Sequence, residues 1–275
     1  MEDRLINNIK EIENYLEKRN VKSKIIDRLY LFEYKTFSKK ENKKTISLNV
    51  EEDENKIKYK NSICNLKEDA TNQEIYKALL KVLSLNVINI SPNKLLACNG
   101  FTDTKYTNKS GVITQYEDVN KIYLNLGVLE FLTRSIYIDI IKKPYDKKIL
   151  GNNVLSDSYI ASEITRILNF IIFETEDTTK LLKLYLKNDL NLFLKKIYQK
   201  IGLEKQEVFE LYEIATIFLT NTFIKKTMPH SDNYDIKLLK TFFKKSYEYA
   251  RNKKIKNAES FFAIEFSKEI ISYLV

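Results

Sequence analysis

The chain of 275 residues has a single histidine, two cysteines, five glycines and no tryptophan. One histidine, His230, cannot supply the two imidazoles of an H-E-x-x-H zinc site or those of a Cys2His2 finger. The glycines are too scattered to form a phosphate-binding loop: Gly100, Gly111, Gly127, Gly151 and Gly202. The longest apolar runs, such as residues 171–173, are far shorter than the roughly 20 residues of a membrane span. We therefore expect no resident metal, no cofactor and no membrane partner.

The two cysteines and the N-terminus indicate the compartment. Cys64 and Cys98 do not form a C-x-x-C pair, and two isolated cysteines are typical of reduced thiols. The first eight residues are acidic and amphipathic, without the basic start and apolar core of a signal peptide. The sequence therefore predicts a cytoplasmic protein.

A formal net charge of +9 raises the question of nucleic-acid binding. Bidentate recognition of phosphate or guanine favours arginine, yet nearly all the basic residues are lysines. Enrichment in Lys, Asn, Ile, Tyr and Phe is typical of an AT-rich genome, so we favour solvated surface lysines and keep nucleic acid as the alternative. Two basic loops are the candidate contacts: Lys39, Lys40, Lys43, Lys44 and Lys253, Lys254, Lys256.

The N-terminal part mixes helices with a hairpin. Apolar residues at helical spacing predict helices over 2–36, with a break near Asn20. Alternating polar and apolar residues over 45–50 and 56–60, around a charged turn, predict a β-hairpin whose lysines protect an edge strand. Thr71 and Glu74 form a capping box that predicts a helix to about residue 85.

The rest of the chain reads as mostly helical. A short strand is expected over 87–90, followed by an irregular loop or loose hairpin over 97–120. Helices are then expected near 124–142, 156–174, 177–187, 189–200, 204–226, 234–250 and 257–273. The domain prediction is an N-terminal part, 1–66, and a mostly helical part, 67–275, with one continuous domain as the alternative.

Four segments together resemble a known family. They are E-I-Y-K-A-L-L-K-V-L-S at 74–84, Gly100–Phe101, L-N-L-G-V-L-E-F-L-T-R at 124–134, and L-Y-L-K-N-D-L at 184–190. Their order is similar to that in zinc metallopeptidases of Firmicutes, which carry an H-E-L-x-H helix, a Gly-Phe loop, an L-N-E-G-x-x-E-x-L-T helix and a Y-F-x-x-D-L helix. The resemblance covers roughly residues 70–200, and the L-N-x-G-x-x-E segment is its most specific part.

The resemblance implies a site from which the zinc chemistry has been lost. The two histidine positions become Lys77 and Lys81, the general base becomes Ala78, and the third ligand becomes Leu126. An ammonium group donates hydrogen bonds but cannot ligate a metal, and neither alanine nor leucine replaces a carboxylate. Because Glu130 is retained, we expect a lysine to compensate the lost cation through a Lys77–Glu130 or Lys81–Glu130 contact. The alternative is that both lysines are ordinary surface residues.

No residue of the chain is assigned a catalytic role. His230 is expected in a loop, and Ser156 is better placed as a helix N-cap than as a nucleophile. The expected fold class is mainly α with a small β-hairpin or sheet near the N-terminus and a zincin-like α+β core.

Three functions remain open. The first is a non-catalytic, pseudo-metallopeptidase-like protein of a bacterium or mobile element that binds another protein. The alternative is a basic helical factor of phage or plasmid type, regulatory or anti-defence, that binds nucleic acid or a nucleoprotein. The third is an enzyme with a carboxylate site that the sequence does not mark.

Overall fold

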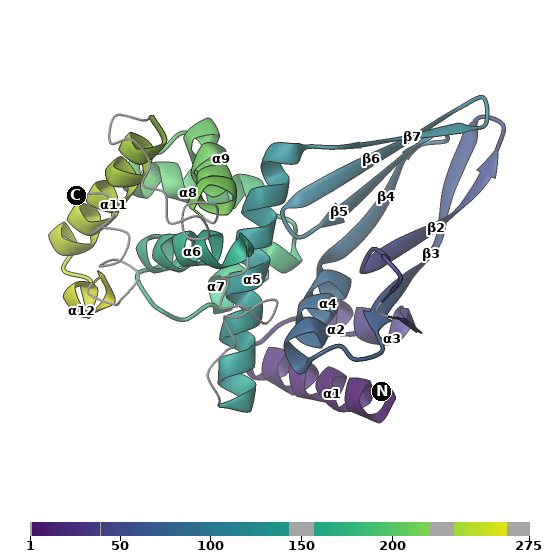
Figure 1. The fold of residues 1–275 in the computed structure, drawn as a ribbon, viewed down its shortest axis with the longest axis horizontal. Coiled ribbons are helices and arrows are strands. Elements are labelled where there is room, and N and C mark those ends of the chain that lie inside the picture. The colour runs from purple at the N-terminus through teal and green to yellow at the C-terminus, as the bar shows by residue number, and fades with distance from the viewer. Residues whose placement is uncertain (1, 39, 143–156, 220–233, 263–275) are drawn as a thin grey trace. The chain divides into compact units, whose positions relative to one another are not determined.

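The computed structural model describes residues 2–38, 40–142, 157–219 and 234–262, and the chain forms two compact units (Figure 1). The first unit contains residues 1–119, 132–145 and 182–189, and the second contains 120–131, 146–181 and 190–275. The predicted boundary after residue 66 lies inside the first unit. Each unit is described by itself below.

The first unit combines short helices with all the strands of the described chain. Its helices before the sheets are α1 (Glu2–Lys18), α2 (Ser23–Ile26) and α3 (Arg28–Leu31). The strands and the helix between them are β1 (Glu33–Phe37), β2 (Ile46–Asp53), β3 (Lys56–Lys67), α4 (Asn72–Ser84), β4 (Leu85–Ser91), β5 (Lys94–Asn99), β6 (Thr102–Lys109) and β7 (Val112–Glu117). The predicted hairpin and the helix after the capping box are confirmed, and so are the N-terminal helices as far as Leu31; the helical prediction is wrong from Glu33 on, where the chain forms β1 and pairs with β3.

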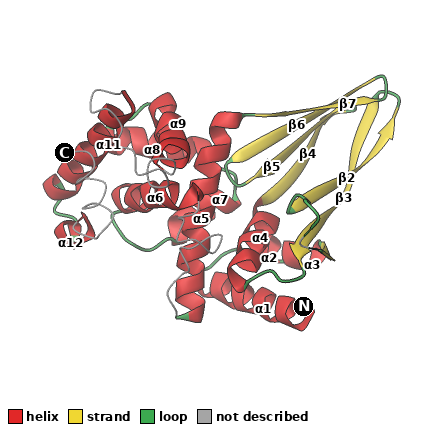
Figure 2. Cartoon of the chain, in the orientation of Figure 1, coloured by secondary structure: helices red, strands yellow, loops and turns green. Residues whose placement is uncertain are grey.

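The strands form two sheets, which are drawn in yellow in Figure 2. The first has the order β1-β3-β2, with β1 parallel and β2 antiparallel to β3. The second is an antiparallel meander, β4-β5-β6-β7. The expected fold class is therefore wrong: 57% of the structure is helical and 23% is strand, and the strands build two sheets in place of one small hairpin.

Of the two expectations for residues 97–120, the irregular loop is wrong and the hairpin is closer, because β6 and β7 pair as an antiparallel hairpin and extend the second sheet together with the end of β5. The segment is rich in Asn, Thr and Asp, which suggested turns. Its strands nevertheless present an apolar face, since Leu95 and Ala97 are buried with Ile57 in a cluster that also includes Tyr106 and Ile113. Burial against the β2–β3 hairpin outweighs the polar composition of the outer face.

Backbone and side-chain hydrogen bonds join the far ends of the two sheets. The buried Asn108 donates from Nδ2 to the Lys56 carbonyl at 2.8 Å and accepts from the Gly111 amide at 3.1 Å. The Gly111 amide also reaches the Glu54 carbonyl at 2.6 Å, and the Asn108 amide reaches the Asn93 carbonyl at 3.0 Å. These bonds hold the β6–β7 turn against the β2–β3 turn.

The second unit is built from helices, which pack around an apolar core. The long helix α5 (Val119–Ile141) contributes its first part here and its last part to the first unit. The remaining elements are α6 (Asp157–Phe173), α7 (Thr179–Leu186, from Leu182 in the first unit), α8 (Leu190–Ile201), α9 (Lys205–Glu213), the π-helix η1 (Ile214–Leu219), α11 (Tyr234–Asn252) and α12 (Ala258–Phe262). The predicted helices are confirmed over these ranges, except that the segment expected as one helix from 204 continues after Glu213 as a π-helix; the predicted parts 220–226 and 263–273 lie outside the described residues.

Gly127 on α5 allows two helices to approach closely. A Cβ at this position would lie 2.7 Å from Tyr212 Cε1 and 2.9 Å from the Cβ and carbonyl oxygen of Ala161. Tyr212 also shares a 2.8 Å hydrogen bond with the Thr165 hydroxyl in the buried core. The glycine of the L-N-x-G segment therefore has a packing role in the second unit.

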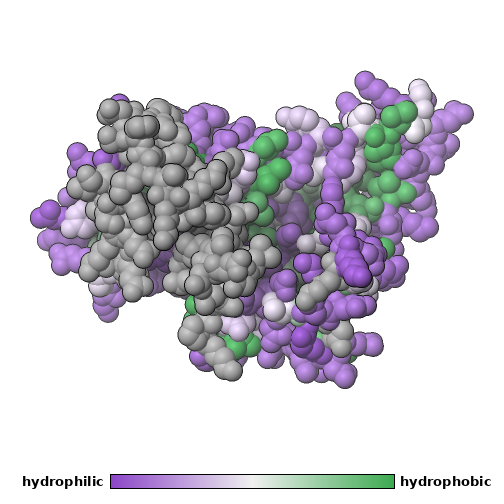
Figure 3. All heavy atoms as spheres, in the orientation of Figure 1, coloured by the Kyte–Doolittle hydropathy of each residue, from purple (hydrophilic) through white to green (hydrophobic). Residues whose placement is uncertain are grey.

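The face of the described chain drawn in Figure 3 is largely polar, because hydrophilic residues predominate over it. None of the described helices is both long enough and apolar enough to cross a membrane.

Candidate functional site: a lysine-lined pocket

The candidate site is centred on α4, in the first unit. The helix begins at the predicted capping box: the Thr71 hydroxyl accepts from the Glu74 amide at 3.2 Å, and the Glu74 carboxylate accepts from the Thr71 amide at 2.7 Å. Ile75, Leu79 and Leu83 lie on its fully buried side. Lys77 and Lys81 follow each other by one turn on the half-buried side.

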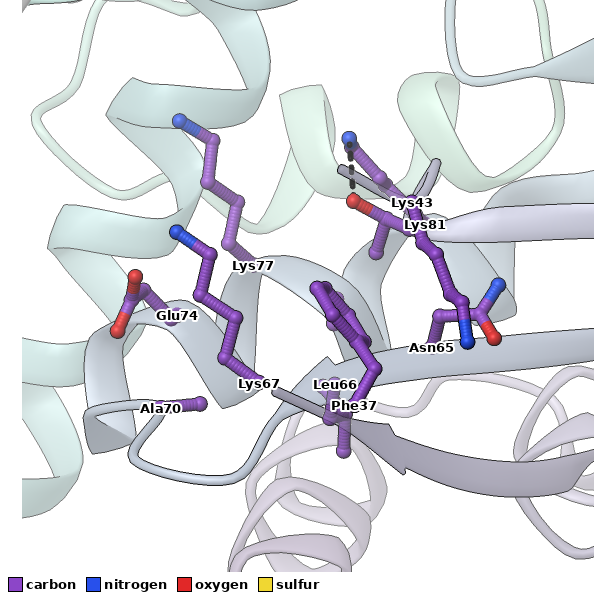
Figure 4. Close-up of a pocket in the computed structure, with 11 residues that line it drawn as sticks. Phe37, Lys43, Asn65, Leu66, Lys67, Ala70, Glu74, Lys77 and Lys81 are labelled. Atoms are coloured by element: carbon purple, nitrogen blue, oxygen red, sulfur yellow. Dashed lines mark hydrogen bonds between the residues drawn. The ribbon is translucent and has the colours of Figure 1, made fainter. Parts of the chain in front are cut away.

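These two lysines line a cavity of about 210 Å³, which is shown in Figure 4. We call this cavity the lysine pocket. Its walls come from the end of β1, the loop before β2, the end of β3 and α4. It is lined by Phe37, Lys43, Thr45, Asn65, Leu66, Lys67, Ala70, Glu74, Lys77, Ala78 and Lys81.

Hydrogen bonds fix the inner wall of the pocket. Lys81 Nζ donates to the Thr45 hydroxyl at 3.3 Å, the bond drawn as a dashed line in Figure 4. Asn65 donates from Nδ2 to the Lys44 carbonyl at 2.9 Å and to the Ser47 hydroxyl at 2.8 Å. The loop that carries Thr45 is thus fastened to β3 beside α4.

The exposed rim of the pocket is charged. Lys43 forms a 2.6 Å ion pair with Glu41 and lies 5.8 Å from the centre of the Phe37 ring. The hydrogen bond from Lys43 lowers the pKa of the Glu41 carboxyl. Lys67 is exposed at the opposite side, and in Figure 4 its side chain extends in the same direction as that of Lys77.

The electrostatics of the inner wall follow from burial. Desolvation lowers the pKa of Lys81, and the neighbouring positive charge of Lys77 lowers it further. Burial raises the pKa of the Cys64 thiol to about 12, although Lys81 acts in the opposite direction. The thiol therefore stays neutral and is a poor nucleophile at neutral pH.

This set of groups suits an anion. Four lysines line the described part of the pocket against two carboxylates: that of Glu74, which accepts hydrogen bonds from Thr71, and that of Glu41 at the rim, which is paired with Lys43. Ammonium groups donate hydrogen bonds and attract negative charge, while a metal cation would be repelled. Within the described residues, no group of three His, Cys, Asp or Glu side chains is placed to hold a metal ion.

The structure places the sequence-predicted site residues in two groups. Lys77, Ala78 and Lys81 lie together in the lysine pocket, with Ala78 buried in its wall. Leu126 is half-buried and Glu130 is 3% exposed, and both belong to the second unit. The expected contact of Glu130 with Lys77 or Lys81 joins the two units and stays a prediction.

Three of the four segments that carry the family resemblance meet in the first unit. Asn188, after α7, donates from Nδ2 to the Ser84 carbonyl at 2.8 Å and to the Gly100 carbonyl at 3.0 Å. The Phe101 ring packs edge-on against Tyr185 with centroids 5.5 Å apart. The end of α4, the Gly-Phe turn and the L-Y-L-K-N-D-L segment are therefore neighbours.

The predicted basic contact loops are exposed and lie in different units. Lys40, Lys43 and Lys44 are in the first unit, and only Lys43 lines the lysine pocket. Lys253, Lys254 and Lys256 are exposed and belong to the second unit. Lys39, Ser156 and His230 lie outside the described residues.

Sequence reasoning missed Thr45, Asn65 and Lys67 as site residues. They converge because β1 pairs in parallel with β3, which places Phe37 opposite Lys67. One sequence signal could have indicated them: the second strand of the predicted hairpin leads through Asn65 and Lys67 directly to the capping box at Thr71.

Comparison of the sequence with protein-family models gives no match, and comparisons with curated proteins and with solved structures give no significant match.

Proposed function

We propose that this chain is a non-catalytic binding protein whose lysine pocket holds an acidic segment of a protein partner. The observation that carries the proposal is the excess of positive charge at the pocket, where Lys43, Lys67, Lys77 and Lys81 converge and the nearby carboxylates are those of Glu74 and of Glu41, the partner of Lys43. Lysine ammonium groups on flexible stems can follow carboxylates of varied geometry. A cavity of about 210 Å³ has room for a carboxylate side chain and its neighbouring atoms.

The proposal includes a relationship to the zinc metallopeptidases, with the metal-binding positions replaced. Lys77, Ala78 and Lys81 share one pocket, as residues at the two histidine positions and the base position would. Further support comes from the neighbouring positions of Ser84, Gly100 and Asn188. Binding without turnover agrees with the replacement of the general base by alanine, which cannot move a proton.

Fluorescence anisotropy tests the binding proposal. The probe is a labelled peptide of alternating Glu and Gly residues, and its partner control carries Gln in place of Glu. We expect the acidic peptide to bind more tightly, and its affinity to fall as salt rises because the lysines are partly solvated. Loss of one partly solvated charge in Lys77→Gln should weaken the affinity about 3- to 10-fold.

Lys24→Gln is the matched control, because Lys24 is an exposed lysine of the same unit outside the pocket. It should bind as the unchanged chain does. Equal binding of the acidic and Gln peptides, or an unchanged affinity in Lys77→Gln, would contradict the proposal.

The nucleic-acid alternative is favoured by one observation, the exposed Lys40 and Lys44 beside the pocket-lining Lys43. A single-stranded oligonucleotide of matched charge distinguishes the two functions in the same assay. Tighter binding of the oligonucleotide, lost in the Lys40→Gln/Lys44→Gln variant with a reduced salt slope, would support the alternative.

A further inference from the structure

Lys81 differs from the other pocket lysines in its surroundings. Its ammonium lies at the inner wall, hydrogen-bonded to the Thr45 hydroxyl at 3.3 Å, while Lys43 and Lys67 are exposed at the rim. Lys81 and the buried Ala78 both line the open cavity. A ligand that enters the pocket can therefore reach the Lys81 nitrogen.

We propose that Lys81 forms an imine with a small carbonyl compound that also carries a carboxylate or phosphate group. This inference rests on the proposed function in one respect: the other pocket lysines bind the acid group of the carbonyl compound, as they bind the carboxylates of the partner in the proposed function. It goes beyond that function by adding a covalent step.

The bonds of this step balance without any redox partner. The neutral Lys81 amine adds its lone pair to the carbonyl carbon, and one of the two amine protons passes to the carbonyl oxygen to give a carbinolamine. The second amine proton then passes from nitrogen to the hydroxyl, which leaves as water while the C=N double bond forms. The Thr45 hydroxyl, already bonded to this nitrogen, is placed to pass a proton during the loss of water.

The electrostatics of the pocket favour the neutral amine. Burial is the main cause of the lowered pKa of Lys81, and the charge of Lys77, one turn earlier, is the next. A lysine that is desolvated and lies beside another cation is a recurrent form of activated amine nucleophile. At neutral pH a larger fraction of Lys81 is therefore unprotonated than of an exposed lysine.

The surrounding cations select the ligand. Lys67 and Lys77 approach the cavity from the side opposite Lys43, so an anionic group finds positive charge on either side of it. The wall offers few apolar side chains, chiefly Phe37 and Leu66. A short ligand that joins a carbonyl to an acid group fits this environment better than an apolar aldehyde.

Reductive trapping with glyoxylate tests the inference on the full chain. Glyoxylate carries an aldehyde beside a carboxylate, and cyanoborohydride converts its imine into a stable carboxymethyl-lysine that peptide mass spectrometry locates. At pH 7 we expect Lys81 to be labelled about 10-fold faster than Lys24. The preference should shrink with propanal, which lacks the acid group, and Lys81→Arg should remove the label at this position.

The pH profile separates activation from mere accessibility. In the unchanged chain the midpoint of labelling at Lys81 should lie below that at Lys24, and Lys77→Gln should move it upward. Labelling at Lys81 that is no faster than at Lys24, or that shows the same midpoint, would overturn the inference. If the acidic peptide still binds in that case, the proposed function stands; labelling of Lys81 without peptide binding would overturn only the proposed function.

Discussion

At the residue scale, the protonation of Lys81 in the lysine pocket affects the stability of the folded chain. Its pKa is lower in the folded chain than the ordinary value of 10.5, because burial and then Lys77 disfavour the charged form. Between the folded and unfolded pKa values the unfolded chain binds more protons, so the free energy of unfolding rises with pH across that window. Below that window the lysine is charged in both states, and the unfavourable effect of burying the charge is present in full.

Replacing Lys81 by methionine should therefore stabilise the chain at pH 7, since the charge is removed and the apolar stem is kept. The gain should shrink as the pH approaches 10.5, where the lysine becomes neutral in both states. Chemical denaturation at several pH values measures this difference in the free energy of unfolding between the variant and the unchanged chain. Lys24→Met, at an exposed position, should show no pH-dependent difference in stability from the unchanged chain. A stability difference for Lys81→Met that stays constant with pH would contradict the interpretation.

Gly127 gives a second prediction at this scale. Gly→Ala inside a helix normally stabilises by up to about 1 kcal/mol. Here the new methyl group would overlap Tyr212 and Ala161, so we expect Gly127→Ala to destabilise by about 1–3 kcal/mol. Thermal unfolding checks the sign, with Lys195→Ala on the exposed side of α8 as the near-neutral control. A more stable Gly127→Ala variant would exclude the close approach of the helices.

At the element scale, the hydrogen bonds of Asn108 hold two turns of the first unit together. Asn108→Ala would leave the Lys56 carbonyl and the Gly111 amide without this partner, at a cost of about 1–3 kcal/mol. The matched control is Asn49→Ala, because the Asn49 side chain bonds only at an exposed site, to Asn61. Urea unfolding should show a clear loss for Asn108 and a change below about 0.5 kcal/mol for Asn49. Equal losses would contradict the proposed role of the buried asparagine.

The elements that the sequence predicts well are those with local signals. The Thr71–Glu74 capping box marks the start of α4, and alternating residues mark the β2–β3 hairpin. The strand β1 was missed, and β5, β6 and β7 were predicted at most as a loose hairpin, for a physical reason. Their stability depends on partners distant in sequence: β1 pairs with β3, and β6 and β7 bury Tyr106 and Ile113 against the hairpin.

At the scale of the whole molecule, the same distinction applies to the site. Lys77, Ala78 and Lys81 were singled out because the family resemblance aligns them with the two histidines and the general base of an H-E-L-x-H helix, and the i, i+4 spacing of the two lysines places them on one helix face. Thr45, Asn65 and Lys67 could not be, since the pairing of three strands brings them to α4. The sequence marks the helical half of the lysine pocket, and the tertiary fold supplies the other half.

The central claim is that the lysine pocket receives carboxylates of a partner. Carbodiimide coupling of the Glu-Gly peptide to the full chain tests it most directly, because this reagent joins a carboxylate to an amine with which it is in contact. The account predicts that mass spectrometry will find the crosslinks concentrated at Lys67, Lys77 and Lys81, and that high salt will suppress them. Crosslinks concentrated at Lys253, Lys254 and Lys256, or spread evenly over exposed lysines, would contradict it.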